Sequence, residues 1–203
     1  MNSPNPLIAL HGLPPFDRIE PGHVKPAIEA LLRDGRQLVE KLAAPATPAS
    51  WNDFAQALGD GLEPLGHAWG IVGHLHSVND IPAWRDAYNE MLPEVTRFFA
   101  ELGQNLALFE KYKALRQGPE YPKLSPTRQR IVDNELRDFR LSGAELPEDQ
   151  KPRFQAIQEE LAGLAAKFSE NLLDATNAFA YYVTDEAELK GIPDDVLTQA
   201  RSS

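Results

Sequence analysis

Three histidines are the residues of this sequence whose type and spacing come closest to a chemical site. His67, His74 and His76 lie close together, and Asp80 follows them. Imidazole nitrogens commonly bind zinc, nickel or copper, so the cluster is the first candidate for a metal site. On a helix, however, His74 and His76 would point about 200° apart. His67 and His74 would share a face but stand about 10.5 Å apart along the axis, too far to hold one ion. We therefore predict no metal site here.

Other catalytic motifs are missing from the sequence. No histidine is followed by glutamate, so the His-Glu-x-x-His motif of zinc peptidases does not occur. No Gly-x-Ser-x-Gly elbow is present, and the glycines of residues 59–73 are not followed by Gly-Lys-Ser/Thr. The acidic pairs at 159–160 and 194–195 are typical of solvated helix faces. We predict neither a catalytic residue nor a metal ligand in this chain.

The composition indicates which partners to expect. The 203 residues include 20 Lys and Arg against 30 Asp and Glu, which gives a formal charge of -10. This charge repels phosphate backbones and anionic lipids, so nucleic acid and membrane are not expected partners. The sequence has no cysteine, which fits a reducing compartment, and residues 1–15 resemble no signal peptide. We expect a cytoplasmic protein.

Apolar residues recur at spacings of three and four over several long segments, which predicts helices. Proline, glycine and capping residues mark the ends of these segments: Ser50 should cap the second helix and Gly143 should stop the fourth, whose Val132, Leu136 and Phe139 should face inward. The proline-rich residues 1–22 predict an extended leader, and residues 23–203 a helical domain. Only residues 178–184 have a β-like composition, so we predict an all-α fold with at most one short β segment. The expected helices cover residues 26–44, 51–72, 82–118 and 126–142, a fifth helix from 147, and a short one from 193.

Several details of these helices are also predicted. Pro93 should kink or break the third helix near residues 89–92, and Asp80 with Pro82 should start it. Asp133 and Arg137 should form an ion pair on the fourth helix. The glycines between 59 and 73 indicate close packing or local breaks in the second helix. The fifth helix should turn an apolar face to the core, made of Phe154, Ile157, Leu161, Leu164, Phe168 and Leu172.

Three ordered segments resemble the thimet oligopeptidase family of zinc metallopeptidases, and together they span nearly the whole chain. The first contains Leu13-Pro14-Pro15-Phe16, Ile19, His23-Val24 and Pro26-Ala27-Ile28. The second contains Leu136-Arg137-Asp138-Phe139, Leu141-Ser142-Gly143 and Leu146-Pro147. The third contains Lys167-Phe168-Ser169, Asn171-Leu172, Asp174-Ala175-Thr176, Thr184-Asp185, Glu188-Leu189 and Gly191-Ile192-Pro193.

This resemblance implies zinc-dependent hydrolysis of short peptides in a deep channel between two largely helical halves. The chain resembles the start of the amino-terminal half, a channel wall, and His74, His76 and Asn79 are the residues expected to line the channel. The His-Glu-x-x-His helix and a further glutamate ligand are expected in the later half, which would be the partner of this segment. Zinc is therefore expected in the longer protein and not here, and these residues alone should be inactive. A non-catalytic all-α interaction module is the alternative, and it would bind peptides without cleaving them.

Overall fold

A computed structural model describes residues 5–8, 12–79 and 81–201. In this described part the chain forms seven α-helices and no strand, so the all-α prediction is confirmed and residues 178–184 are not a strand. The chain divides into two compact units, Met1–Ala166 and Lys167–Ser203. The helices are α1 (Val24–Ala43), α2 (Ala57–Val78), α3 (Pro82–Gly103), α4 (Leu106–Gln117), α5 (Pro126–Leu141), α6 (Lys151–Ala178) and α7 (Asp194–Arg201).

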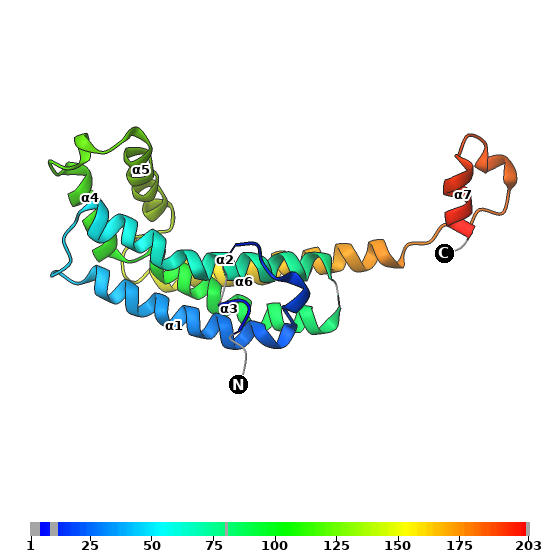
Figure 1. The fold of residues 1–203 in the computed structure, drawn as a ribbon, viewed down its shortest axis with the longest axis horizontal. Helices are drawn as coiled ribbons and strands as arrows, with labels where there is room; N and C mark the ends of the chain where they lie inside the picture. Colours follow the sequence, from blue (N-terminus) through cyan, green and yellow to red (C-terminus); the bar gives the residue numbers. More distant parts are fainter. Residues whose placement is uncertain (1–4, 9–11, 80, 202–203) are drawn as a thin grey trace. The chain divides into compact units, whose positions relative to one another are not determined.

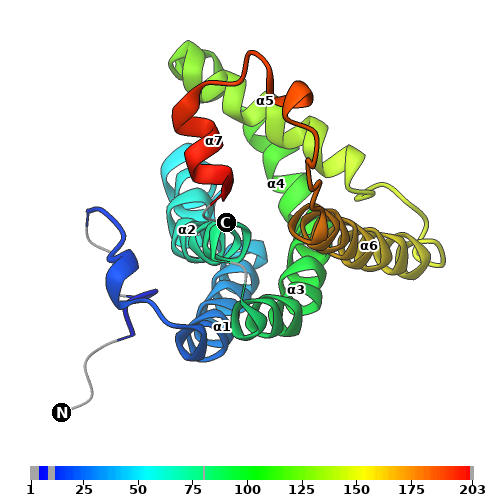
Figure 2. The same ribbon diagram turned by 90° about the vertical axis from the view of Figure 1, so that its right-hand side faces the viewer.

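Helices α1, α2 and α3 lie side by side and enclose the first core cluster of the first unit (Figures 1 and 2). Their buried faces repeat at helical spacing, as the sequence pattern predicts. The cluster includes Ile28 and Leu32 of α1, Leu65 and Val72 of α2, and Phe98 of α3, all at most 3% exposed. Burial of such side chains, each worth about 1.5–3 kcal/mol, is the main force that holds this bundle together.

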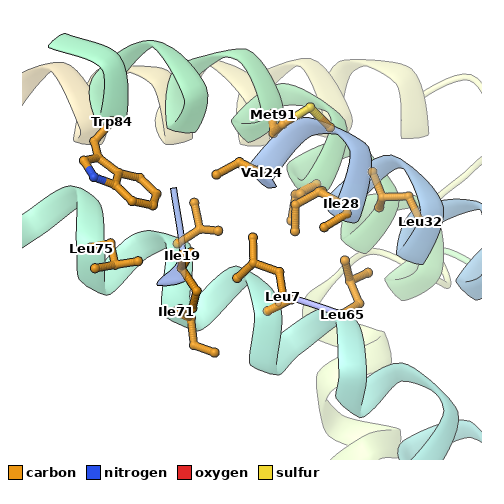
Figure 3. Packing of buried hydrophobic residues seen from close by; sticks show 14 of the residues in the cluster. Leu7, Ile19, Val24, Ile28, Leu32, Leu65, Ile71, Leu75, Trp84 and Met91 are labelled. Atoms are coloured by element: carbon orange, nitrogen blue, oxygen red, sulfur yellow. The ribbon is translucent and has the colours of Figure 1, made fainter. Parts of the chain in front are cut away.

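The leader contributes to the same cluster. Leu7 is 1% exposed and Ile19 is 6% exposed, and both lie against the residues of the bundle (Figure 3). The Asn5 side-chain amide donates to the carbonyl oxygen of His23 at 2.8 Å. Residues 12–22, predicted to be extended, contain helical turns over Phe16–Arg18 and at the start of Pro21–His23. Residues 1–4 and 9–11 of the predicted leader lie outside the described residues.

A second core cluster lies where α4 packs against α5, α1 and residues Trp51–Gln56, which precede α2. Residues Trp51–Gln56 begin as a π-helical turn, in which the amide of Ala55 donates to the carbonyl oxygen of Ser50 at 3.2 Å. The Ser50 hydroxyl also accepts from the Asp53 amide at 3.1 Å, so the predicted cap is confirmed. The largest side chains of this cluster are Trp51, Phe54, Phe109, Tyr112, Tyr121 and Phe139.

The segment predicted to be the third helix forms two helices, and the chain does not break near Pro93. α3 continues through Pro93, because Met91 and Val95 on either side of it are buried and their packing outweighs a cost of about 3 kcal/mol. The chain breaks instead after Gly103, where the Asn105 side chain accepts from the Leu108 amide at 3.1 Å and caps α4. Asp80, predicted to help start α3, lies outside the described residues.

Helix α5 buries Val132, Leu136 and Phe139 as predicted, but the predicted pair between Asp133 and Arg137 is wrong. Asp133 instead accepts from Arg116 of α4 at 2.8 Å and from the Tyr121 hydroxyl at 2.9 Å. The two donors come from two elements that pack beside α5, and between them they occupy both oxygens of the carboxylate. The predicted helix stop at Gly143 is confirmed, with φ at 88°.

Helix α6 departs most from the sequence prediction. Its residues are all described, and none of them is buried. The apolar face predicted to enter the core is exposed: Leu161 by 55%, Leu164 by 56% and, in the second unit, Phe168 by 69%. The spacing correctly predicted a helix, but the residues that the structure describes do not cover the apolar face of α6.

The second unit contains the end of α6, a 3₁₀ turn over Glu186–Leu189, and α7. Asp185 caps the 3₁₀ turn by accepting from the Ala187 amide at 2.9 Å. The Tyr181 hydroxyl donates to Glu188 at 2.9 Å, although Tyr181 itself is 69% exposed. None of the residues of this unit whose side chains are described is buried.

Candidate functional site on helix α2

The predicted channel-lining residues lie at the end of α2 and in three different surroundings. His74 is exposed and faces an open hollow beside the leader. His76 points to another side of the helix, where its ring stacks on Tyr88 of α3. Asn79 is exposed and ends α2, and its backbone N–H donates to the carbonyl oxygen of Leu75 at 2.9 Å. The structure therefore does not bring the three side chains together in one site.

An open hollow beside His74 is the candidate binding surface nearest the predicted residues. Its volume is about 580 Å³, and its lining comes from one face of α2 together with one aromatic residue of the leader. The Phe16 ring meets the His74 ring edge-on, with centroids 5.5 Å apart. Its lining residues are Phe16, Glu63, Gly66, His67, Gly70, Ile71 and His74.

Two glycines form the floor of this hollow. A Cβ added at Gly66 or Gly70 would meet no atom of the described structure within 4 Å, so both positions leave helix backbone open to the hollow. The expected close packing holds elsewhere: a Cβ at Gly61 would clash with Leu38, and α2 runs through its glycines without a break. The glycines at 66 and 70 therefore open a space and do not tighten a helix contact.

The sequence carries a signal for this hollow that the metal-ligand interpretation of the histidines overlooks. Glu63, Gly66, Gly70 and His74 follow one another at spacings of three and four, and His67 lies four residues after Glu63, which places them on one helix face. A face that combines glycines with imidazoles indicates an open polar surface, whether or not the imidazoles can bind a metal. The part played by Phe16 could not be read from spacing, because it depends on how the leader packs.

On another side of α2, three rings stack in a row. Trp69 and Tyr88 are parallel within 9° with centroids 4.9 Å apart, and Tyr88 and His76 within 10° at 4.3 Å. Trp69 and His76 are seven residues apart, a rise of about 10.5 Å on one helix face, so the Tyr88 ring fits between them. The stack fixes α2 against α3 and holds His76 away from the other two histidines.

Zinc does not fit the histidines of α2. His67 and His74 share the hollow but are seven residues apart, and His76 faces Tyr88. The His67 Nδ1 atom lies 3.7 Å from the Glu63 carboxylate, its i−4 neighbour. Among the residues that the structure describes, no group of three His, Cys, Asp or Glu side chains could hold a metal ion; Asp80 lies outside them.

The hollow can bind a ligand, but it has no arrangement for a reaction. Two imidazoles can donate or accept hydrogen bonds, Phe16 offers an aromatic edge, and the glycine backbone allows close approach. No nucleophile and base pair lines it. The hollow thus presents hydrogen-bonding and aromatic groups but no catalytic arrangement.

Two groups whose pKa is raised by burial lie away from the hollow, at the contact between α4 and α5. Burial raises the pKa of the Tyr112 phenol, and the nearby Glu135 carboxylate adds to the shift. Burial also raises the pKa of Glu135, with a smaller contribution from Asp138. Both groups lie beside a hydrophobic cluster, and we interpret them as structural.

None of the described helices combines the length and the apolar character that a bilayer-spanning segment needs.

Comparison with known sequences extends across the chain. Residues 28–151 match the family described as Neurolysin/Thimet oligopeptidase, N-terminal domain. Oligopeptidase A of Escherichia coli and that of Salmonella typhimurium are each 39% identical over 198 residues, 98% of this chain. Probable cytosolic oligopeptidase A of Arabidopsis thaliana is 38% identical over 195 residues. The chain spans only 29% of the length of the two bacterial relatives and 28% of the plant one.

Proposed function

The chain belongs to the neurolysin/thimet oligopeptidase family, as the amino-terminal domain of that family, and we propose that it forms the substrate-channel wall of a longer zinc-dependent endopeptidase. The observation that supports this best is the 39% identity to oligopeptidase A over 98% of the chain. The longer protein would hydrolyse short peptides. This segment would limit which substrates reach the catalytic centre.

The hollow on α2 is the surface we assign to peptide contact. His74 lines this hollow and would touch the peptide directly. Asn79, exposed at the end of α2, would touch the peptide outside the hollow. His76, on another side of α2, would hold the helix in position through its stack on Tyr88. A wall that is helical and firmly packed suits this role, because it excludes folded proteins by bulk and needs no reactive group of its own.

Zinc and the catalytic residues belong, in this proposal, to the remaining part of the longer protein. The histidines of α2 do not fit a zinc ion, and the chain contains no His-Glu-x-x-His motif. The 203 residues alone would therefore be inactive. The remainder of the polypeptide and short peptides are the proposed partners, and the cytoplasm is the proposed location, since the chain has no cysteine.

The test compares two proteins: the 203-residue chain and the full polypeptide encoded by its gene. The full polypeptide should cleave a short internally quenched peptide, lose that activity with a chelator, and regain it when zinc is added. The short chain should cleave nothing under the same conditions. Chelator-resistant cleavage by the full protein, or cleavage by the short chain, contradicts the proposal.

A non-catalytic interaction module is the second candidate, and one observation favours it. The exposed apolar face of α6 is a surface of the kind that binds protein partners. The same experiment separates the two functions, because a module would bind the peptide without cleaving it in either form.

A further inference from the structure

Residues 151–166 of helix α6 belong to the first unit, and a polar contact links them to α3. Arg97 of α3 donates from Nε to the Glu159 carboxylate at 3.2 Å, and Gln155, on α6 itself, donates to the same oxygen at 3.2 Å. The side of α6 with partial burial includes Gln155, Gln158 and Glu159, together with Phe154 at the start of the apolar face. The large apolar residues that follow Phe154 on this face are exposed.

The apolar side of α6 faces solvent. We define the α6 stripe as Phe154, Ile157, Leu161 and Leu164, all in the first unit. Ile157 is 37% exposed, and Leu161 and Leu164 are 55% and 56% exposed. Their spacing of three, four and three residues is the pattern by which one helix packs along another. The stripe therefore has the form of a helix-packing surface without its second helix.

Apolar surface continues from the stripe onto its neighbours. A hollow of about 430 Å³ begins at Phe154 and is lined on α3 by Phe99 and at the end of α5 by Leu141. Phe99 is 40% exposed and Leu141 is 70% exposed. A partner that covers the stripe can insert a side chain into this hollow.

The comparisons indicate where that partner comes from. The match to the amino-terminal domain of the family ends at residue 151, the first residue of α6. Each helix within the match, α1 to α5, has buried residues, whereas α6 has none, and all residues of α6 are described. This chain covers 29% of each bacterial relative, so more than twice the covered length lies outside the matched part. Fully buried residues thus end where the matched family domain ends, although residues 151–166 still belong to the first compact unit.

We propose that α6 is the first element of the next structural unit, and that an amphipathic helix from the polypeptide following in the longer relatives packs along the α6 stripe. This inference rests on the proposal that the chain is part of such a longer protein. It moves the domain boundary from the predicted single domain 23–203 to a division near residue 151.

A second copy of the chain is a poorer occupant for the stripe. Four partly exposed side chains on each copy bury far less than the about 1,200 Å² typical of a stable dimer. Each copy also carries a formal charge of -10, so two copies repel each other. A covalently continuous segment avoids both costs, because its effective concentration is high.

Thiol labelling can test the proposal, because the chain has no native cysteine. Leu161→Cys places a thiol in the stripe, and Ala156→Cys places a control thiol on exposed α6 surface about 140° around the helix. Each variant is made in the 203-residue chain and in the full polypeptide, with cysteines of the added part changed to serine. The rate of maleimide labelling is measured in all four proteins, and circular dichroism checks that each is folded.

In the short chain both thiols should react at similar rates. In the full polypeptide the thiol at 161 should react roughly tenfold or more slowly, while that at 156 changes by less than about twofold. Equal labelling at 161 in both proteins overturns the inference, as does protection in the short chain that grows with its concentration, which identifies a second copy as the occupant. Peptide cleavage is measured separately, so a protected thiol in an inactive full polypeptide rejects the proposed function and not this inference.

Discussion

The rings of Tyr88 and His76 are stacked, with an angle of 10° between their planes and centroids 4.3 Å apart. This contact joins α3 to α2 and explains why a histidine that the sequence placed in a cluster takes no part in one. His76, which was considered as a metal ligand and predicted to line the channel, is here part of a packing contact, with Trp69 on the other side of Tyr88.

Replacing Tyr88 tests the stack. Tyr88→Leu should lower the free energy of unfolding by about 1–2 kcal/mol, because two aromatic contacts are lost while an apolar side chain remains. Tyr88→Phe keeps both rings and should cost less. Urea denaturation followed by circular dichroism measures both, and equal costs for the two variants would show that the ring contacts contribute little.

The two kinds of glycine should respond in opposite directions to alanine. Gly70→Ala should stabilise the chain by about 0.5–1 kcal/mol, because the new Cβ meets nothing and alanine favours the helix. Gly103→Ala should destabilise it by about 1–3 kcal/mol, because its Cβ would come within 2.5 Å of Ser142 Cβ. Urea midpoints give both values. A gain at both positions would contradict the packing of α3 against the end of α5.

Gly70→Ala also tests the hollow in the full polypeptide. Its methyl group would enter the proposed peptide-contact surface, so kcat/KM for a short peptide should fall although stability rises. Gly59→Ala is a matched control, since its Cβ also meets nothing and Gly59 does not line the hollow. An unchanged kcat/KM for Gly70→Ala removes the hollow from the peptide path.

Glu135 should make stability depend on pH near its own titration. Burial raises the pKa of this carboxyl above its ordinary value of 4.5, so the unfolded chain loses the proton first as pH rises. The free energy of unfolding therefore falls above pH 4.5, and ionised Glu135 costs stability at pH 7. Glu135→Gln should gain roughly 0.5 kcal/mol at pH 7, a small value because the side chain is only partly buried.

This gain should disappear below about pH 4, where the carboxyl is protonated in both states. Glu29→Gln is the control, because it removes one negative charge from an exposed position on α1. A gain at Glu29 equal to that at Glu135 would assign the effect to net charge and not to burial.

Tyr112 should weaken the fold in alkaline solution. Burial raises the pKa of its phenol above 10.0, so above that pH the unfolded state ionises first and the free energy of unfolding falls. Tyr112→Phe cannot ionise and should show a smaller fall between pH 9 and 11. Parallel pH titrations of unfolding for both proteins decide this, and identical slopes would contradict the burial of the phenol.

The 203-residue chain should retain no stoichiometric zinc after dialysis at neutral pH. The spacing of His67 and His74 is too long for one tetrahedral ion, and His76 is engaged with Tyr88. Metal analysis by mass spectrometry measures this. One zinc per chain that is lost in His74→Ala would overturn the geometric argument.

Periodicity predicted the helices well because it reflects local geometry. The Ser50 cap, the buried face of α5 and the stop at Gly143 all follow from residues close in sequence. The break after Gly103 was not predicted, because Pro93 is the stronger helix-breaking signal in this segment and the cap at Asn105 is a weaker one. The partner of Asp133 was missed because Arg116 lies on another helix, 17 positions earlier.

The candidate site was only partly predictable, for a related reason. The sequence identified His74, but the hollow around it exists because the leader folds back and places Phe16 beside that ring. The apolar face of α6 was recognised, but a pattern on one helix does not say what covers it. Long-range packing decided each of these outcomes.

The position of the leader has a consequence for synthesis on the ribosome. Leu7 and Ile19 are buried in a cluster that also includes Ile71 and Trp84, so residues made earlier pack beside residues made much later. At about 5–20 residues per second, the roughly 65 residues from Ile19 to Trp84 take about 3 to 13 seconds to translate. During that interval the cluster that buries the two side chains is incomplete. Docking of the leader is then a late step of folding, although the leader leaves the exit tunnel before the helices against which it packs.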